Sequence, residues 1–480
     1  MLVRAGSGVA VSLKQHAFYA VGAAMIGAGT RFLILVLLAR LFPQAQVGQF
    51  AYVLFLVDVS FLLVCFGMNA AAGRYLAEYA AEPARRASFF VWWCRRSIWV
   101  PPIAGGAVLL VLLASGLELS PAAAAGIAFW AMAYAGQSLL LAAFAGLQRF
   151  DQVFAVTALG AAASLSAVVL AAWAGLPLAG LYALMGAACI ASVLLALKHF
   201  SPLWRAGQPA GARPGFWAIT SSYSLNMWLT ALLWALVWSR GELPVVRHWL
   251  GDVALAHYSV ALSLMAGLMT AVMLGSAVFA AQVTRLWGED RKPEAYTLCR
   301  KVSEWQLVVA AIGAAFVVCF NEELVRVAFG EGYADSAAIL AVLVCGLPVM
   351  ALAMQNHLIQ IKTNGRFSRN VAVLGLVVLL VVAITLVPYW GAQGAAIARV
   401  ATMGLMGAAS IAYLLMRIDA SVLPRCPIAA TMLVPVLALV VLFDGEEITD
   451  RAIVFLICAL CIGAGHVLAR GRKPTGEVRP

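Results

Sequence analysis

Apolar runs of about 20 residues recur along the whole chain, and short segments that carry most of the charges separate them. An α-helix rises 1.5 Å per residue, so a run of this length crosses a hydrocarbon core about 30 Å thick. We therefore predict an all-α chain with about fourteen membrane-spanning helices. The predicted spans cover residues 17–39, 48–72, 98–116, 121–145, 153–174, 177–197, 216–239, 254–282, 305–320, 337–360, 370–388, 392–416, 427–443 and 452–469.

The composition excludes a water-soluble fold. Of the 480 residues, 64% are hydrophobic and only 11% are charged, and the mean hydropathy is +0.95. Soluble domains carry about 25% charged residues. The longest loops between predicted spans hold about twenty residues, too few for an inserted soluble domain. Whatever the protein does must therefore take place in the membrane.

Basic residues are concentrated on one side of the predicted spans. With the N-terminus in the cytoplasm, 25 of the 32 Lys and Arg residues fall on cytoplasmic segments and five on the opposite loops. Cytoplasmic loops of membrane proteins hold this excess of positive charge, so we predict that both termini are cytoplasmic. The net charge of +11 is then a sign of topology, and we expect no nucleic-acid partner.

Signatures of catalysis are missing from the sequence. It contains no Walker lysine loop, no His-Glu-x-x-His motif and no acidic pair of the glycosidase type. Asp58 is the single carboxylate within the predicted spans. We therefore expect neither an ATPase nor a membrane hydrolase, and we predict that the protein is not an enzyme and has no catalytic residues, metal site or cofactor.

The chain is predicted to consist of two halves. A segment rich in Pro and Gly, residues 201–215, follows the sixth predicted span and would link an N-terminal six-helix lobe (1–200) to a second lobe (216–416). Residues 417–480 would form two extra helices and a basic cytoplasmic tail. Val47-Gly-Gln-Phe-Ala-Tyr aligns weakly with Val253-Ala-Leu-Ala-His-Tyr at the corresponding outer turn of each lobe. Such repeats are typical of transporters built from two bundles.

Several short motifs occur in an order and at spacings that resemble the polysaccharide-transport branch of the superfamily that also contains multidrug and toxic-compound extruders and the lipid II flippase. The motifs are Leu37-Leu-Ala-Arg-Leu-Phe-Pro43, Val47-Gly-Gln-Phe-Ala-Tyr52, Arg74-Tyr-Leu-Ala-Glu78, Gly146-Leu-Gln-Arg-Phe-Asp151, Ala254-Leu-Ala-His-Tyr-Ser-Val-Ala261 and Gly391-Ala-Gln-Gly-Ala-Ala396.

The resemblance implies a V-shaped pair of six-helix lobes in the inner membrane, open alternately to the cytoplasm and the periplasm. It implies a cargo of undecaprenyl-diphosphate-linked oligosaccharides for O-antigen, capsule or exopolysaccharide synthesis. Membrane lipids, a polymerase and a chain-length protein would be partners, and a proton or sodium gradient could drive transport. The alternatives are a cation-coupled multidrug antiporter, the lipid II flippase, and a ligase or polymerase of surface glycans.

Arg31 and Asp58 are the strongest candidates for a translocation site. They lie about 13 Å and 16 Å from the outer ends of the first and second predicted spans, so an antiparallel hairpin would bring them within one helical turn. An ionisable side chain at this depth normally faces a bundle interior or a watery pathway. The pair would either lock two helices together or present Arg31 to a pyrophosphate or acidic sugar, with Asp58 positioning it or exchanging a proton.

Four further residues complete the predicted site. Arg399 lies at a similar depth in a later span and would either bind an anion or snorkel to the outer headgroups. Asn226, near the middle of the seventh span, could contact sugars. Arg74 and Arg285 end corresponding spans on the cytoplasmic side, where they could attract the diphosphate, although the positive-inside bias explains them equally well.

Overall fold

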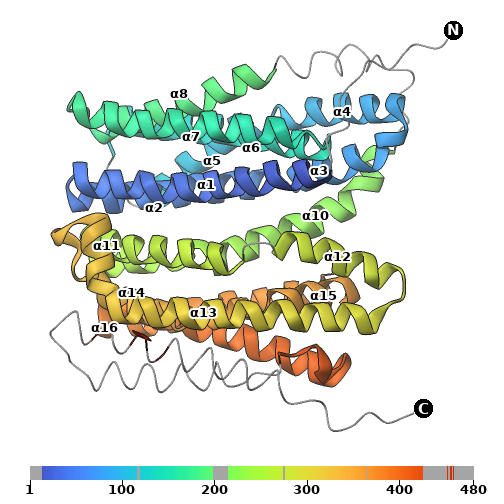
Figure 1. Ribbon diagram of the computed structural model, residues 1–480. Helices are drawn as coiled ribbons and strands as arrows, with labels where there is room; N and C mark the ends of the chain where they lie inside the picture. The colour runs from blue at the N-terminus through green and yellow to red at the C-terminus, as the bar shows by residue number, and fades with distance from the viewer. Residues whose placement is uncertain are drawn as a thin grey trace. The chain divides into compact units, whose positions relative to one another are not determined.

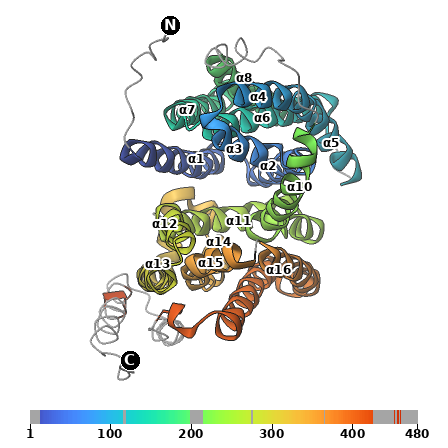
Figure 2. The ribbon, with the colours of Figure 1, turned by 90° about the vertical axis from the view of Figure 1, so that its right-hand side faces the viewer.

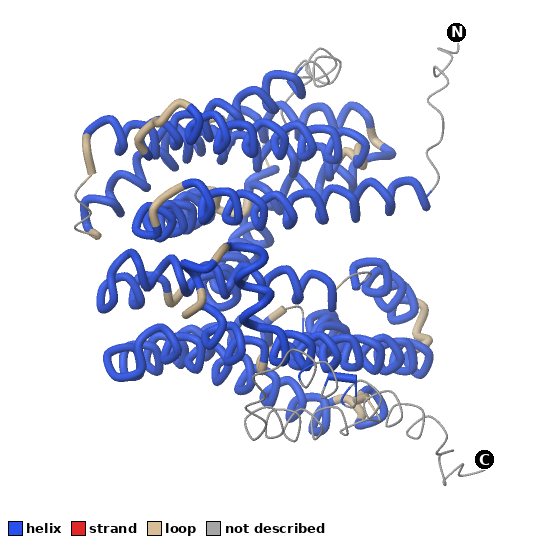
Figure 3. Tube along the Cα trace, turned by 60° about the vertical axis from the view of Figure 1, so that its left-hand side comes forward, coloured by secondary structure: helices blue, strands red, loops and turns tan. Residues whose placement is uncertain are grey.

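The computed structural model describes residues 13–115, 119–197, 215–273, 276–363 and 365–424, together with Arg451, Phe455, Leu456 and Cys458. The described residues form helices joined by short loops and turns, with no strand among them (Figure 3). Nine of the described helices are long and apolar enough to cross a membrane. The prediction of an all-α polytopic protein is confirmed, whereas the number of fourteen spans stays a prediction.

The chain divides into two compact units. Unit 1 comprises Met1–Ile34 and Val53–Leu232, and unit 2 comprises Leu35–Tyr52 and Leu233–Pro480. The linker predicted at 201–215 lies outside the described residues except at its last position, so the predicted boundary between lobes stays a prediction. The predicted extra spans, 427–443 and 452–469, fall almost wholly outside the described part of the chain.

Unit 1 is built from helices that pack through small residues. Gly126 in α6 lies so close to α8 that a Cβ atom there would be 3.0 Å from the Ala179 carbonyl oxygen. Such small residues let helix backbones approach closely within a membrane, and α6 accordingly packs against both α5 and α8 (Figures 1 and 2). The helices that lie wholly or for the larger part in this unit are α1 (Leu13–Leu41), α2 (Gln44–Val64), α3 (Met68–Glu78), α4 (Pro83–Ser97), α5 (Val100–Ala114), α6 (Pro121–Gly146), α7 (Phe150–Trp173), α8 (Leu178–Leu197) and α10 (Phe216–Trp234).

The second predicted span is not one helix. The backbone breaks at Phe66 and Gly67, which have φ values of 43° and 74°, and the span becomes α2 followed by α3. A Cβ atom at Gly67 would lie 2.1 Å from the Ser224 carbonyl oxygen of α10. The indole of Trp228, one turn further along α10, donates to the Leu62 carbonyl oxygen at 2.6 Å. The close approach of α10 therefore requires glycine at this break.

Unit 2 contains a run of π-helix (Ala235–Arg240) and two long helices that are broken at a glycine. Gly251 and Gly391 have φ values of 78° and 57°, and each interrupts a helix at an expected turn between spans. Near the second break, a Cβ atom at Gly394 would lie 2.6 Å from the Leu386 carbonyl oxygen, so the chain turns back on itself there. The helices are α11 (Leu243–Val272), α12 (Ser276–Gly288), α13 (Lys292–Phe329), α14 (Ser336–Val344), α15 (Ala353–Thr363) and α16 (Arg366–Arg417).

The outer turn between α1 and α2 packs within unit 2. Arg40 donates to the carbonyl oxygens of Ala328, at 3.0 Å, and of Val327, which have no partner within α13 because they lie in its last turn. A Cβ atom at Gly48 would lie 1.8 Å from the Asp252 carbonyl oxygen. The two segments that the sequence aligns as a weak repeat are therefore in contact around this glycine.

Large apolar side chains occur both in the interior and on the outer surface of each unit. Phe144 and Tyr182 are fully buried in unit 1, as is Tyr258 in unit 2, whereas Leu110 and Leu113 of α5 are largely exposed. Extended apolar surface of this kind is rare on soluble monomers, and it fits helices that face lipid. The hydrophobic surface thus agrees with the polytopic class.

Candidate functional site

Arg31, Asp58 and Tyr134 form a polar cluster within the apolar helices of unit 1. The Arg31 guanidinium donates from Nη1 to Asp58 Oδ2 at 3.2 Å and from Nη2 to Asp58 Oδ1 at 3.3 Å. Nη2 also donates to the Tyr134 hydroxyl at 3.1 Å. The predicted pairing of Arg31 with Asp58 is therefore present, and Tyr134 is a third member that the sequence did not reveal.

Three helices position this cluster. Arg31 lies ten residues before the end of α1, about 15 Å along the helix axis, and Asp58 lies on α2 beyond the short turn at Phe42 and Pro43. Phe61, three residues after Asp58, packs edge-on against the Tyr134 ring of α6, with ring centroids 6.0 Å apart. The hairpin of α1 and α2 brings the charges of Arg31 and Asp58 together, and the packing of α2 against α6 places the Tyr134 hydroxyl beside them.

The cluster is accessible, and this distinguishes it from a buried ion pair. The side chain of Arg31 is 51% exposed and that of Asp58 is 23% exposed. The bonds to Asp58 and Tyr134 occupy three of the five N–H donors of the guanidinium. A guanidinium with donors to spare can bind the oxygens of a phosphate through its planar fork.

Arg399 of α16 occupies a completely different environment in unit 2. Its Nε and Nη2 donate to Glu242 Oε1 and Oε2 at 2.7 Å and 2.8 Å, and Nη1 donates to the Trp238 carbonyl oxygen at 2.8 Å. The side chains of Arg399 and Glu242 are only 3% and 0% exposed. Arg399 therefore does not snorkel to the headgroups, and its burial gives no support to the predicted contact with an anion.

The sequence interpretation missed Glu242 and Tyr258. The predicted span 216–239 leaves Glu242 outside the membrane-spanning part of the chain, but Glu242 is the residue that precedes α11 and is fully buried. The Tyr258 hydroxyl donates to Glu242 Oε1. A carboxylate two residues before Pro244 at a helix start is a weak hint. Nothing in the sequence links Glu242 to an arginine 157 residues away.

Arg74 and Asn226 are associated with the same face of α10. The Arg74 guanidinium lies 4.4 Å from the ring centroid of Tyr223 and 3.3 Å from Glu78 Oε2. Asn226 follows Tyr223 by three residues, which places both on one face of the helix. The Asn226 amide is exposed and donates to the Ser222 carbonyl oxygen at 3.0 Å. A sugar-binding role for Asn226 and an anion-attracting role for Arg74 stay predictions.

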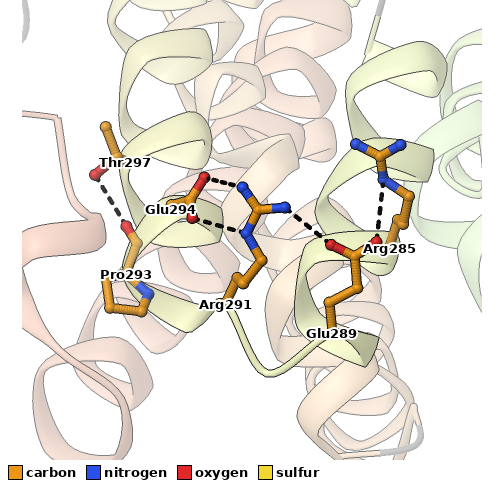
Figure 4. A network of polar contacts seen from close by, with 6 residues as sticks. All are labelled: Arg285, Glu289, Arg291, Pro293, Glu294 and Thr297. Carbon is orange, nitrogen blue, oxygen red and sulfur yellow. Dashed lines mark hydrogen bonds and ion pairs between the residues drawn. The ribbon is translucent and has the colours of Figure 1, made fainter.

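Arg285 belongs to a chain of charges at the turn between α12 and α13 (Figure 4). Its Nε lies 3.7 Å from Glu289 Oε1. Glu289 also pairs with Arg291 at 3.0 Å, and Arg291 pairs with Glu294 at 2.7 Å. The positive charge of Arg285 is thus offset locally, and the geometry adds no evidence that Arg285 attracts a diphosphate.

The fold is shared with solved transporters. The lipid II flippase MurJ in an inward closed conformation superposes with a TM-score of 0.68 at 12% identity, over 95% of this chain and 99% of that one. An inward-facing multidrug resistance transporter of the MATE family, in the MOP superfamily, gives 0.64 at 14% identity, over 86% and 96%. A MOP superfamily transporter from Pyrococcus furiosus gives 0.55 at 14% identity, over 85% and 96%.

These similarities define the class of protein as a polytopic membrane protein with the fold of MOP superfamily transporters. The chain belongs to the polysaccharide biosynthesis protein family, whose model matches residues 13–285. A search of curated proteins returned no match. The resemblance inferred from the sequence motifs is thereby confirmed at the level of the family and the fold.

Proposed function

We propose that this protein flips undecaprenyl-diphosphate-linked oligosaccharides from the cytoplasmic to the periplasmic leaflet of the inner membrane, without covalent chemistry. The family supports a role in polysaccharide synthesis, and the fold supports a transporter. Both termini would be cytoplasmic, and the two lobes would open alternately to either side. Energy would come from a proton or sodium gradient, and the flipped units would pass to a polymerase and a chain-length protein.

The observation that carries this proposal is the half-exposed guanidinium of Arg31. A cation inside an apolar helix is unfavourable, by at least about 2.5 kcal/mol on insertion scales, so its retention in an accessible position requires a reason. The planar fork of its guanidinium fits the oxygens of a diphosphate. Arg31, with Asp58 and Tyr134, is therefore the proposed headgroup site, and Asn226 is the proposed contact for sugars.

Flipping in proteoliposomes tests the proposal. Labelled undecaprenyl-diphosphate glycans would be placed in one leaflet, and transfer would be compared between wild type, Arg31→Ala and Arg326→Ala at matched amounts of folded protein. Arg326 is a matched control, because its side chain is 52% exposed and also lies near a carboxylate, 3.7 Å from Glu331. A hydrogen bond to a charged group contributes about 1.5–3 kcal/mol, so Arg31→Ala should slow flipping at least about tenfold.

Each alternative function gives a different result in the same vesicles. Efflux of organic cations without flipping of any glycan carrier would identify a multidrug antiporter. Flipping of lipid II in preference to oligosaccharide carriers would identify a lipid II flippase, and joined glycan products would identify a ligase or polymerase. Normal flipping by Arg31→Ala would refute the assigned headgroup site.

A further inference from the structure

The anion that Arg31 holds in this structure is part of the protein itself. Both carboxylate oxygens of Asp58 accept from the guanidinium, at 3.2 Å and 3.3 Å. These distances exceed the range of about 2.7–2.9 Å that is usual for charge-assisted hydrogen bonds. The pair between Arg399 and Glu242 lies within that range, at 2.7 Å and 2.8 Å. The bond between Arg31 and Asp58 is therefore the looser of the two.

We propose that Asp58 is a tethered counter-ion that competes with the diphosphate of the cargo for Arg31, and so limits how tightly the cargo is held. This inference rests on the proposed function. In the empty site Asp58 neutralises Arg31. When cargo binds, the diphosphate oxygens replace the Asp58 carboxylate on the guanidinium, and when cargo leaves, the carboxylate returns.

Exchange is favoured over simultaneous binding by the chemistry of the donors. The carboxylate occupies one N–H of each terminal nitrogen, so a diphosphate that takes the same bidentate position must displace it. A diphosphate bound beside an undisplaced Asp58 would also suffer like-charge repulsion, which low local dielectric strengthens. The side chain of Asp58 is 23% exposed, so packing does not enclose the carboxylate completely.

The buried pair in unit 2 shows why exposure matters for exchange. Glu242 is 0% exposed, and Arg399 is also bonded to the Trp238 carbonyl oxygen. An external anion cannot reach that guanidinium without breaking the packing around it. Of the two arginines within apolar helices that the sequence singles out, Arg31 alone has a partner that can be exchanged.

The strength of the competition follows from the strength of the ion pair. An exposed pair contributes up to about 1 kcal/mol, which leaves roughly one arginine in six unpaired. Because the apparent dissociation constant equals the intrinsic constant divided by the competent fraction, removal of the competing charge should tighten binding by at most about sixfold. Tighter binding normally arises from slower dissociation, so the same change should slow turnover.

Binding of farnesyl diphosphate to the full chain in nanodiscs tests this inference, with farnesol as a control for binding through the prenyl tail. Asp58→Asn should bind farnesyl diphosphate about fivefold tighter than wild type while flipping glycan carriers more slowly. Asp58→Glu keeps the charge and should resemble wild type. Asp252→Asn is a matched control, because Asp252 is 31% exposed and pairs with Arg247 at 2.8 Å; it should leave binding unchanged.

The outcomes separate the inference from the function on which it rests. Thermal unfolding of each variant shows whether it is folded. If Asp58→Asn is unstable, Asp58→Glu still tests the site, because it keeps the competing carboxylate and should bind farnesyl diphosphate with the affinity of the wild type. Weaker or unchanged binding by folded Asp58→Asn would overturn the competition and leave Asp58 as a residue that positions Arg31. If Arg31→Ala binds farnesyl diphosphate as well as wild type does, the headgroup site itself is wrong.

Discussion

Loss of the buried ion pair in unit 2 should be the most destabilising single change among the charged residues described here. Arg399→Met removes the hydrogen bonds to both carboxylate oxygens of Glu242 and to the Trp238 carbonyl oxygen. It leaves a carboxylate with 0% exposure beside apolar helices. Breaking such a pair from one side costs about 3–5 kcal/mol, which lowers the ratio of folded to unfolded protein by about two to three and a half orders of magnitude.

The reasoning predicts that removing both charges restores stability. A buried pair replaced by apolar residues of similar volume is often neutral or more stable, because neither charge then needs to be desolvated. Tyr258 would lose its acceptor in the double variant, and an orphaned buried hydroxyl costs about 1–3 kcal/mol. The informative comparison is therefore between Arg399→Met, Arg399→Met with Glu242→Leu, and the triple variant that adds Tyr258→Phe.

Thermal unfolding in detergent, followed by size-exclusion chromatography and intrinsic tryptophan fluorescence, provides the assay. Arg399→Met should lose folded protein at a markedly lower temperature, the double variant should recover most of the loss, and the triple variant should recover more. A loss that grows with each added substitution would refute the reasoning. Flipping per folded molecule should survive in the triple variant, because the ion pair is assigned a structural role.

Two further changes test the packing of the helices. Gly48→Ala would place a Cβ atom 1.8 Å from the Asp252 carbonyl oxygen, and such overpacking typically costs about 1–3 kcal/mol of stability. Gly29→Ala is the control, because a Cβ atom at Gly29 would have no neighbour within 4 Å. This variant should have a melting temperature equal to or higher than that of the wild type. Gln137 of α6 donates a hydrogen bond to the Ser192 hydroxyl of α8 at 2.7 Å. Gln137→Leu should therefore lower the free energy of unfolding by about 0.6–1.7 kcal/mol. A double-mutant cycle with Ser192→Ala that shows no coupling energy between the two positions would contradict this.

The two intramembrane arginines illustrate how one residue type serves different ends. Arg31 and Arg399 look alike in the sequence, each a single cation in a long apolar run. Their surroundings differ, since Arg31 is half-exposed with a loosely held carboxylate and Arg399 is fully buried with a tightly held one. Exposure, and not the residue type, is the reason why the proposed cargo site contains Arg31 and omits Arg399.

The class of the protein and one part of the site follow from the sequence alone. Apolar run length determines which segments can cross a membrane, because backbone groups in lipid must be satisfied within helices. Arg31 and Asp58 could be paired from the sequence because they lie on consecutive helices joined by a short turn, where helical rise converts residue number into depth. Local geometry was sufficient in both cases.

Other features were decided only by the tertiary structure. The break at Gly67 depends on the approach of α10, which lies about 150 residues further along the chain. The bond between Arg399 and Glu242 joins residues separated by 157 positions, and Tyr134 reaches Arg31 across 103. Periodicity and hydropathy describe only neighbouring residues, whereas these contacts arise from the packing of distant helices, which determines whether an intramembrane charge is accessible or sealed.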